Sequence, residues 1–296
     1  MEFVVTGGAG FIGSHLAEAL LKKGGVTVVD NLSSGFKENV PEGVELVNAS
    51  VLDYGKLEEA ISTADVVFHL GGVVGVPVSI RHPDFCFRVN VNGTANVLEA
   101  AKKHGSRVVF ASSAAVYGDR PKVPSRETDA TAPASPYAES KLQAEKQLAA
   151  FAGEVQTIAL RLFNVFGPRQ NITGGYAAVV PAFVNAAKKG RPLKIEGDGS
   201  QTRDFVFVED AVQAFLLAGE KGSGVYNIGS GKPTRIKELA KKIIALTESE
   251  SQIVFAPGRE GDVHDSLADV SKAKKDLGYS PKHSLGEGLR KVIEYG

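Results

Sequence analysis

The chain has 296 residues, and 43% of them are hydrophobic, so it can bury a large core. Its 34 basic and 34 acidic residues cancel, which leaves no net field that would gather nucleic acid or an anionic membrane. The single cysteine, Cys86, excludes an intramolecular disulfide and a cysteine-based metal cluster, and we predict no metal site. A predicted strand follows Met1 directly, and no run of about eighteen apolar residues is present. We therefore expect a cytoplasmic protein without a signal peptide, a membrane span or a nucleic-acid partner.

The first predicted element is a strand that runs into a glycine-rich turn. Residues 3–5 are apolar strand formers, and glycines follow at Gly7, Gly10 and Gly13. Apolar residues then recur at helical spacing and predict a helix: Phe11, Ile12, Leu16, Leu20 and Leu21. Such a turn lets the backbone approach a pyrophosphate, whose charge is favoured at the helix N-terminus. Glycine turns without a ligand also join strands to helices, but this context favours dinucleotide binding.

The second predicted strand, 26–29, ends in Asp30. A carboxylate at this place accepts hydrogen bonds from both ribose hydroxyls of the adenosine and repels a 2′-phosphate. The next residue is Asn31 rather than an arginine, so the sequence favours NAD over NADP. The polar turn 31–35 follows and can wrap around the same ribose.

Strands and helices alternate in the stretch that follows. We predict strands at 45–47, 65–70 and 107–111 and a helix at 90–104. This alternation predicts a Rossmann-type, doubly wound parallel sheet with right-handed crossovers. His69 lies at the end of a strand that is buried on both faces, so we interpret it as a hydrogen-bonded core residue rather than a base.

A further helix and strand complete this part of the chain. Ser135 is a plausible N-cap and Pro136 suits the first position of the helix, and a buried strand follows at 157–162. From about Gly167 the predicted elements are shorter and richer in glycine and proline: a helix near 177–188, strands near 194 and 205–208, and helices from Glu209, Ile236 and Ser271. We predict an α/β fold with an NAD-binding domain at 1–166 and a smaller C-terminal α/β substrate domain at 167–296, some segments of which return to the first domain.

Tyr137 and Lys141 lie one turn apart on the same face of the predicted helix. The reference pKa of tyrosine is near 10, and lowering it by about three units favours the phenolate by roughly 4 kcal/mol. The Lys141 ammonium, together with a positively charged nicotinamide ring, can supply that shift. Ser113, at a neighbouring strand end, can hydrogen-bond the same substrate oxygen. A packing tyrosine and a solvated lysine are the alternative, but the dinucleotide fold and the serine-rich strand end favour catalysis.

Several short motifs follow one another along the chain: Thr6-Gly7-Gly8-Ala9-Gly10-Phe11-Ile12-Gly13, Asp30-Asn31-Leu32, Asn90-Val91-Asn92-Gly93-Thr94, Ser112-Ser113-Ala114-Ala115-Val116-Tyr117-Gly118, Tyr137-x-x-x-Lys141, Arg203-Asp204-Phe205 and Asn227-Ile228-Gly229. Together they resemble the extended short-chain dehydrogenase/reductase family, and most closely its UDP-glucose (UDP-galactose) 4-epimerase branch. The resemblance implies a tightly held NAD, a UDP-hexose substrate, inversion at C4 through a 4-keto sugar, and a homodimer.

The resemblance also implies roles for individual residues. The catalytic residues are Ser113, Tyr137 and Lys141. Cofactor contacts are expected from Gly7, Gly10, Phe11, Ile12, Gly13, Asp30, Asn31, Ser34, Gly35, Ser50, Val51, Leu70, Gly71, Asn90, Tyr137 and Lys141. Substrate contacts are expected from Ser113, Tyr137, Asn164, Val179, Arg203, Arg259, Asp262 and Ser266. Paired guanidinium contacts suit a diphosphate, although Arg203 beside Asp204 can also form a surface salt bridge.

Three positions depart from the family pattern. Ser50 stands where relatives usually have an aspartate that receives the adenine amino group. The stretch 71–74 lacks the lysine that some epimerases have near the cofactor phosphates, and Ala115 replaces a threonine found in others. None of these changes removes a catalytic group.

Other functions stay open at this point. A nucleotide-sugar 4,6-dehydratase or a uronate decarboxylase shares the first oxidation, but dehydratases of the family have Asp-Glu after the catalytic serine or threonine, where this chain has Ala114-Ala115. A non-catalytic NAD-sensing protein is disfavoured by the intact catalytic residues. Ser266 matches the position at which a tyrosine resembles a gate against N-acetyl groups, so its small side chain predicts that N-acetylated sugars are also accepted.

Overall fold

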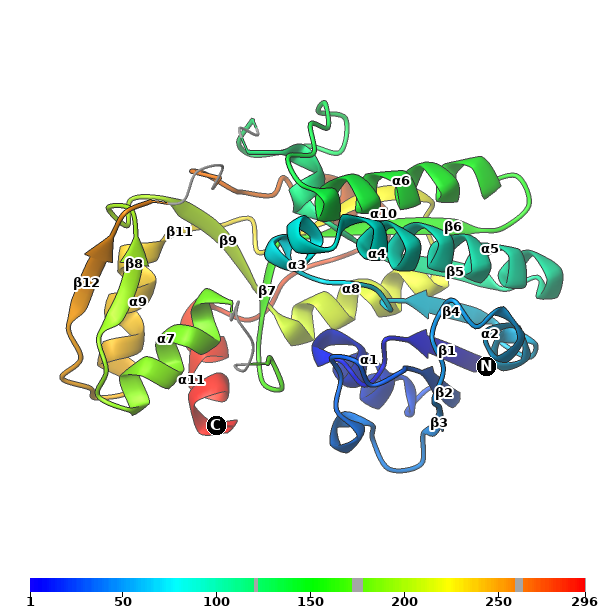
Figure 1. Ribbon diagram of the computed structural model, residues 1–296, viewed down its shortest axis with the longest axis horizontal. Coiled ribbons are helices and arrows are strands. Elements are labelled where there is room, and N and C mark those ends of the chain that lie inside the picture. Colours follow the sequence, from blue (N-terminus) through cyan, green and yellow to red (C-terminus); the bar gives the residue numbers. More distant parts are fainter. Residues whose placement is uncertain (120–121, 172–177, 259–262, 296) are drawn as a thin grey trace.

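The computed structural model describes residues 1–119, 122–171, 178–258 and 263–295. Its main element is a seven-stranded parallel sheet with the strand order β10-β6-β5-β4-β1-β2-β3 (Figure 1). The strands are β1 (Glu2–Thr6), β2 (Gly25–Val29), β3 (Glu45–Val47), β4 (Val66–His69), β5 (Arg107–Ser113), β6 (Thr157–Leu162) and β10 (Gly224–Ile228). The predicted parallel sheet is therefore confirmed.

The strand order changes direction beside β1. The chain adds β2 and β3 on one side of β1, and then crosses to add β4, β5 and β6 on the other side. The carboxyl ends of β1 and β4 approach each other closely, because a Cβ atom on Gly7 would lie 2.7 Å from the backbone nitrogen of Gly71. Open α/β sheets bind their ligands at such a point of reversal.

Helices cover both faces of the sheet, which makes it doubly wound (Figure 1). Phe3 and Val5 of β1 belong to one core with α1 (Phe11–Leu20) and α8 (Val208–Glu220). Val4 points the other way, into a second core. On that face lie α2 (Tyr54–Ile61), α5 (Gly93–His104) and α6 (Pro136–Phe151), with α3 (Val76–Arg81) and α4 (Pro83–Phe87) packed on α6.

Local sequence patterns predicted the elements around the site, with differences of a few residues at their ends. The hydroxyl of Ser135 accepts a hydrogen bond of 3.2 Å from the backbone N–H of Ala138, so α6 begins with the predicted cap. Strand β5 extends to Ser113, two residues beyond the predicted end. Helix α5 begins at Gly93 rather than at residue 90, because a π-helical turn, η2 (Arg88–Asn92), precedes it. Two 3₁₀ turns, η1 (Lys37–Asn39) and η3 (Ala114–Tyr117), complete this part.

The C-terminal half forms smaller layers beside the large sheet (Figure 1). One sheet has the order β11-β9-β7 and another pairs β12 with β8. Their strands are β7 (Asn164–Phe166), β8 (Leu193–Glu196), β9 (Thr202–Phe207), β11 (Pro233–Arg235) and β12 (Ile253–Ala256). The helices are α7 (Val179–Lys188), α9 (Ile236–Leu246), α10 (Ser271–Leu277) and α11 (Leu285–Tyr295). Strand β10 joins the large sheet and α8 packs on it, whereas the division into domains at residue 166 stays a prediction.

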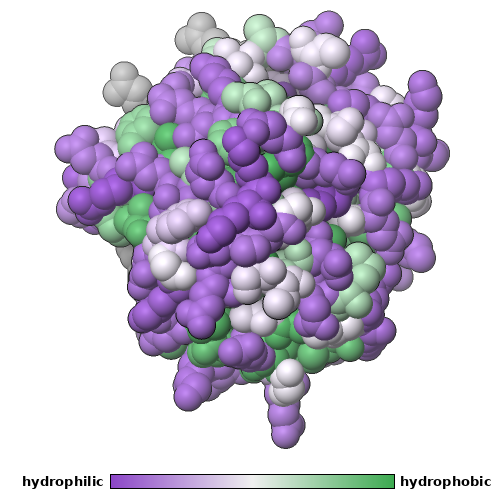
Figure 2. All heavy atoms as spheres, turned by 90° about the vertical axis from the view of Figure 1, so that its right-hand side faces the viewer, coloured by the Kyte–Doolittle hydropathy of each residue, from purple (hydrophilic) through white to green (hydrophobic). Residues whose placement is uncertain are grey.

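Two features are absent from the described residues. No helix among them is both long and apolar enough to cross a membrane. In the same ranges, no group of three or more histidine, cysteine, aspartate and glutamate side chains is arranged to hold a metal ion. The face in Figure 2 carries mostly hydrophilic side chains, with hydrophobic ones scattered among them, as is ordinary for a protein surface.

Candidate active site

The glycine turn after β1 has a conformation that requires its glycines. Gly7 has a φ of +73°, in the region that side chains disfavour. A Cβ atom on Gly13 would lie 2.2 Å from the carbonyl oxygen of Gly7, so the helix can approach the turn only without a side chain there. Gly10 is the N-cap of α1, and no side chain caps the helix. The first N–H groups of α1 are therefore available to an anionic group, as a pyrophosphate site requires.

Asp30 lies beside this turn at the end of β2. One carboxylate oxygen accepts a hydrogen bond of 3.0 Å from the backbone N–H of Ala9, and the other accepts one of 2.8 Å from Leu32. These bonds fix the carboxylate, and each oxygen keeps a further lone pair for a ligand hydroxyl. The hydroxyl oxygen of Ser50 accepts a 3.2 Å hydrogen bond from the N–H of Leu52, and a hydroxyl that accepts can also donate.

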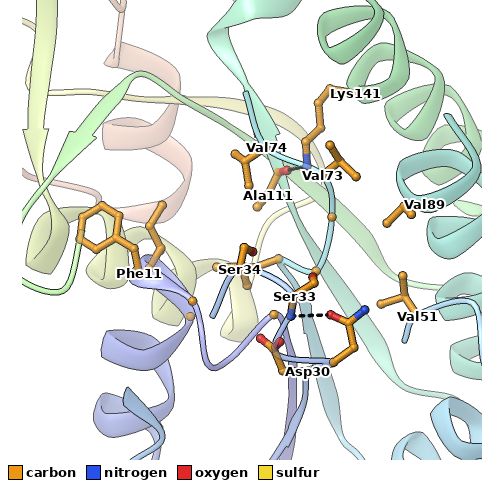
Figure 3. A pocket seen from close by; sticks show the side chains of 18 of the residues that line it. Phe11, Asp30, Ser33, Ser34, Val51, Val73, Val74, Val89, Ala111 and Lys141 are labelled. Atoms are coloured by element: carbon orange, nitrogen blue, oxygen red, sulfur yellow. Dashed lines mark hydrogen bonds between the residues drawn. The ribbon is translucent and has the colours of Figure 1, made fainter. Parts of the chain in front are cut away.

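A cavity of about 640 Å³ extends from this turn to α6. In Figure 3, Asp30 and Ser33 lie toward one end of it, and Lys141 and Ala111 toward the other. The cavity is lined by most of the residues that we expected to contact the cofactor: Gly7, Gly10, Phe11, Ile12, Gly13, Asp30, Asn31, Ser34, Ser50, Val51, Leu70, Gly71, Tyr137 and Lys141. An elongated site with a bare helix N-terminus in the middle and a fixed carboxylate at one end fits a dinucleotide.

Two of the expected cofactor residues, Gly35 and Asn90, do not line this cavity. A Cβ atom on Gly35 would lie 2.7 Å from the carbonyl carbon of Ala9, so Gly35 lets two loops pack behind the wall. Asn90 is buried, accepts a hydrogen bond of 2.7 Å from the N–H of Val73 and donates one of 2.9 Å to Ser140. Both residues support the wall of the site rather than facing it.

Five apolar residues of the wall were not among the predicted cofactor contacts. Val73, Val74, Val78, Phe85 and Val89 line the cavity from the segment between β4 and α5, and Figure 3 labels Val73, Val74 and Val89. Val73 and Val74 lie in the loop before α3, and the other three fall in two very short helices and the π-helical turn, so no regular apolar pattern can develop. The one available signal was their position after Gly71 and Gly72, at the end of a buried strand.

His69 is a core residue, as we interpreted it. The side chain is fully buried, and its two ring nitrogens form hydrogen bonds of 2.7 and 3.0 Å with the hydroxyls of Thr6 and Thr94. Burial, and to a smaller extent the charge of Lys141, lowers the pKa of His69 to about 3. A neutral ring with both nitrogens occupied is not a general base.

The expected catalytic residues meet at the far end of the cavity. Lys141 Nζ donates a hydrogen bond of 2.8 Å to the carbonyl oxygen of Ala111 and lies 6.0 Å from the ring centre of Tyr137. Ser113, two residues beyond Ala111, hydrogen-bonds the Tyr137 side chain. The carboxyl end of β5 and the first turns of α6 thus bring the three side chains together.

The electrostatics of these groups differ from the sequence-based expectation. Burial raises the pKa of Tyr137 above its usual value, while the hydrogen bond from Ser113 acts in the opposite direction. Burial lowers the pKa of Lys141 to about 8, although the neighbouring Cys86 and Glu145 act in the opposite direction. In the protein alone, desolvation therefore outweighs the Ser113 hydrogen bond, and a phenolate at Tyr137 needs positive charge in the cavity.

A smaller cavity of about 220 Å³ adjoins the large one, because Ser113, Leu162 and Phe163 line both. It gathers four of the expected substrate residues from separate elements: Ser113, Asn164, Arg203 and Ser266. Four further lining residues were not among the predicted substrate contacts: Tyr117, Gly118, Ser125 and Val263. Val179 begins α7 and lines neither cavity. Arg259 and Asp262 lie outside the described residues.

Asp204 is not half of a surface salt bridge, so that alternative for Arg203 and Asp204 is wrong. The carboxylate is fully buried and accepts hydrogen bonds from Ser230, from the N–H of Gly231 and from the N–H of Ala268. Arg203, the preceding residue on β9, points the other way, toward the smaller cavity, and donates to the carbonyls of Thr202 and His264. Alternation along a strand explains the opposite directions.

Comparisons with known proteins agree with this geometry. Residues 3–229 match the model of the NAD dependent epimerase/dehydratase family. The UDP-glucose 4-epimerase of Mycolicibacterium smegmatis is 39% identical over 310 residues, covering 100% of this chain and 98% of that protein. The UDP-N-acetyl-alpha-D-glucosaminuronate decarboxylase of Bacillus cytotoxicus is 37% identical over 310 residues, covering 99% of this chain and 96% of that protein.

A solved structure is similar along the whole chain. The UDP-glucose 4-epimerase of Thermotoga maritima, crystallised with UDP-glucose, superposes with a TM-score of 0.96 at 41% identity, covering 100% of this chain and 98% of the other. Curated relatives thus include both epimerases and decarboxylases that act on UDP-sugars. The expected family and the NAD cofactor are confirmed. The chain belongs to the NAD dependent epimerase/dehydratase family, within the extended short-chain dehydrogenase/reductases.

Proposed function

We propose that the protein is an epimerase that inverts C4 of a UDP-hexose through a 4-keto intermediate. The observation that carries the proposal is the position of Ser113 and Tyr137. Both line the large cavity that fits a dinucleotide, and Ser113 also lines the adjoining small cavity. A sugar bound in the small cavity would present a hydroxyl to Ser113 and Tyr137 at the boundary of the two sites.

The large cavity would hold NAD through the glycine turn and Asp30. Bound NAD supplies a hydride acceptor that returns the hydride in the same cycle, so no net redox change occurs. The bare N-terminus of α1 would hold the pyrophosphate, and the fixed carboxylate of Asp30 would accept the ribose hydroxyls.

Tyr137 would act as the acid and base of the reaction. Its phenolate would take the proton of the sugar 4-hydroxyl as the 4-keto sugar forms, and would return the proton after the sugar has turned over in the cavity. Ser113 would hydrogen-bond the same oxygen and hold it in place. Lys141, whose pKa of about 8 leaves it mostly protonated at neutral pH, would stabilise the phenolate.

The nucleotide would anchor the intermediate while the hexose turns. Arg203 faces the small cavity with a planar guanidinium that suits phosphate oxygens, and Asn164 lies exposed at the start of β7 in the same wall. Arg259, Asp262 and Val179 are retained as proposed substrate contacts on the resemblance alone. Binding energy on the diphosphate and base, rather than on the hexose, permits rotation of the sugar.

A uronate decarboxylase is the second candidate, because one of the relatives carries that name. A decarboxylase needs a partner for the sugar carboxylate. Among the described residues that line the small cavity, Arg203 is the one with a full positive charge, and we assign it to the diphosphate. Small neutral residues, Ala114 and Ala115, follow Ser113, which favours a neutral hexose and also argues against a 4,6-dehydratase.

Incubation of the purified protein with UDP-glucose, UDP-N-acetylglucosamine and their uronate forms tests the proposal. We expect UDP-galactose from UDP-glucose, and the N-acetylated epimer because Ser266 is small. A pentose product with release of carbon dioxide from a uronate form would establish the decarboxylase instead. Absence of turnover with bound NAD would favour a non-catalytic NAD-sensing protein. We also propose that the enzyme is a cytoplasmic homodimer, which light scattering on the eluted protein and fractionation of cells can test.

A further inference from the structure

A buried ion pair joins the helix that carries Tyr137 and Lys141 to the sheet behind the site. Glu145, one turn after Lys141 on α6, accepts hydrogen bonds of 3.0 and 2.7 Å from Nε and Nη2 of Arg161 on β6. The two side chains are only 5% and 6% exposed. Although burial lowers the pKa of Arg161, the hydrogen bonds and charge of Glu145 raise it above its usual range, so the pair is ionised.

The same carboxylate holds the strand end of the catalytic site. Ser112 donates a short hydrogen bond to the oxygen of Glu145 that also accepts from Arg161 Nε. Ser112 directly precedes Ser113 on β5, and Ser112 is buried. Glu145 thus ties the positions of β5, β6 and α6 to one another immediately behind the proposed catalytic residues.

Arg161 extends this contact toward the sugar side of the site. Its guanidinium carbon lies 4.8 Å from the ring centre of Tyr117, a residue that lines the small cavity. The hydroxyl of Tyr117 donates a hydrogen bond of 2.7 Å to Asn227 on β10, whose side-chain nitrogen donates one of 2.8 Å to the carbonyl of Ser125. The N–H of Ser125 donates to the carbonyl of Leu267, next to Ser266. A continuous set of polar contacts therefore leads from α6 to the loop that faces the sugar.

Stability alone is a poor explanation for such a pair. Removing water from two charges is costly, and well-packed apolar side chains of similar size often replace buried ion pairs without loss of stability. Arg161 Nη1 is also buried and has no hydrogen-bond partner among the described residues, which adds to that cost. The directional bonds of the pair, in contrast, hold three elements in one geometry, and small displacements of catalytic groups reduce rates strongly.

We propose that Glu145 and Arg161 are positioning residues, which hold Ser113 and the wall of the sugar cavity in register with Tyr137 and Lys141. The proposal rests on the function proposed above, because it concerns the same reacting groups. Neither residue lines either cavity, so both act through Ser112, Tyr117 and α6.

Glu145 has a second, electrostatic effect on Lys141. The groups that face Lys141 are Tyr137 and Glu145 on its own helix, Cys86 on α4 and His69 on β4. Burial lowers the pKa of Lys141 to about 8, and the charge of Glu145 opposes this effect. Loss of that charge lowers the pKa further, so we expect the loss of activity at alkaline pH to begin at a lower pH in Glu145→Gln.

Three variants test the proposal. Glu145→Gln keeps the shape of the side chain and removes its charge. The double variant Glu145→Gln/Arg161→Met also removes the guanidinium that the first change leaves unpaired. Glu154→Gln is the control, because Glu154 forms an exposed ion pair with Lys102. We expect kcat to fall at least about 10-fold in both Glu145 variants, with KM, bound NAD and affinity for UDP nearly unchanged. The melting temperature should fall in the single variant and recover in the double variant. Recovery of kcat together with stability, or a folded Glu145→Gln with parental kcat, would overturn the proposal.

The rate of the first oxidation can be measured without knowing the final product. In a single turnover, the near-ultraviolet absorbance of reduced nicotinamide follows the first oxidation with whichever UDP-sugar the parent protein accepts. A parent that oxidises only a UDP-uronate refutes the proposed 4-epimerase but leaves the test of positioning intact with that substrate. Equal oxidation rates in the parent and in both Glu145 variants reject positioning, whatever the product.

Discussion

The side chain of Lys141 donates a 2.8 Å hydrogen bond to the backbone carbonyl of Ala111, two residues before Ser113. This bond places the ammonium at the end of β5, beside the strand that carries the serine and 6.0 Å from the ring centre of Tyr137 on its own helix. The residues lie thirty positions apart in the chain, and the contact exists only because α6 packs on the sheet.

Replacement of Tyr137 by phenylalanine tests the acid and base role. We expect Tyr137→Phe to lose at least about two orders of magnitude in turnover, the usual range for a positioned acid/base group, while UDP-sugar still binds. Product formation and equilibrium binding are measured on the same preparation. Tyr54→Phe, at an exposed position, is the control and should keep the parental rate. Near-normal epimerisation by Tyr137→Phe would mean that this tyrosine is a packing residue.

Purified protein should carry NAD, because a catalyst that returns its hydride in each cycle has no need to release the cofactor. Gly13→Ala should lose most of it, since the new Cβ atom would lie 2.2 Å from the carbonyl oxygen of Gly7. Gly153→Ala is the matched control, because no atom lies within 4 Å of a Cβ there. Nucleotide released by denaturation is identified and quantified in all three proteins. No nucleotide in the parent, or mainly NADP, would contradict the assignment of the site.

His69 should make the folded protein less stable in acid. The folded-state pKa is about 3, whereas the unfolded chain takes up this proton below about 6.5, so stability falls as the pH decreases from 6.5 toward 3. Between pH 7 and pH 5 we expect His69 to account for about 2 kcal/mol of lost unfolding free energy.

Urea unfolding of the parent and of His69→Gln at both pH values measures this difference. The variant is expected to be less stable than the parent at pH 7, because the bonds to Thr6 and Thr94 change, but to lose less stability on acidification. His82→Gln, at an exposed position, is the control. The same loss on acidification in the parent and in His69→Gln would show that the ring is protonated in the folded protein.

Ser266 should decide how large a sugar the small cavity admits. Ser266 lines that cavity, and its N–H donates a hydrogen bond of 3.2 Å to the carbonyl of Thr202, which holds the loop against β9. We expect Ser266→Tyr to suppress turnover of the N-acetylated pair alone, because its ring would occupy the space beside the C2 substituent. Ser266→Ala removes the hydroxyl without adding bulk and should keep both activities. Equal loss of both sugar pairs in Ser266→Tyr, or no N-acetylated activity in the parent, rejects this assignment.

The sequence by itself determined the features that depend on residues close together in the chain. The glycine spacing after β1, the Ser135 cap of α6 and the spacing of Tyr137 and Lys141 act within one or two turns, so local conformation and periodicity predict them. Hydrophobic runs likewise predicted the central strands, because parallel strands are buried on both faces.

Only the tertiary structure decided the features that join distant residues. β10 takes its place beside β6, and β7 forms beside β9, through pairing with distant strands, because both are short. Gly35 and Asn90 lie behind the cavity wall rather than in it, since the side that a residue presents depends on how two loops pack. The Glu145–Arg161 pair and its contact with Ser112 also join residues that are distant in the chain. They depend on how β5, β6 and α6 pack, and no spacing along the chain predicts them.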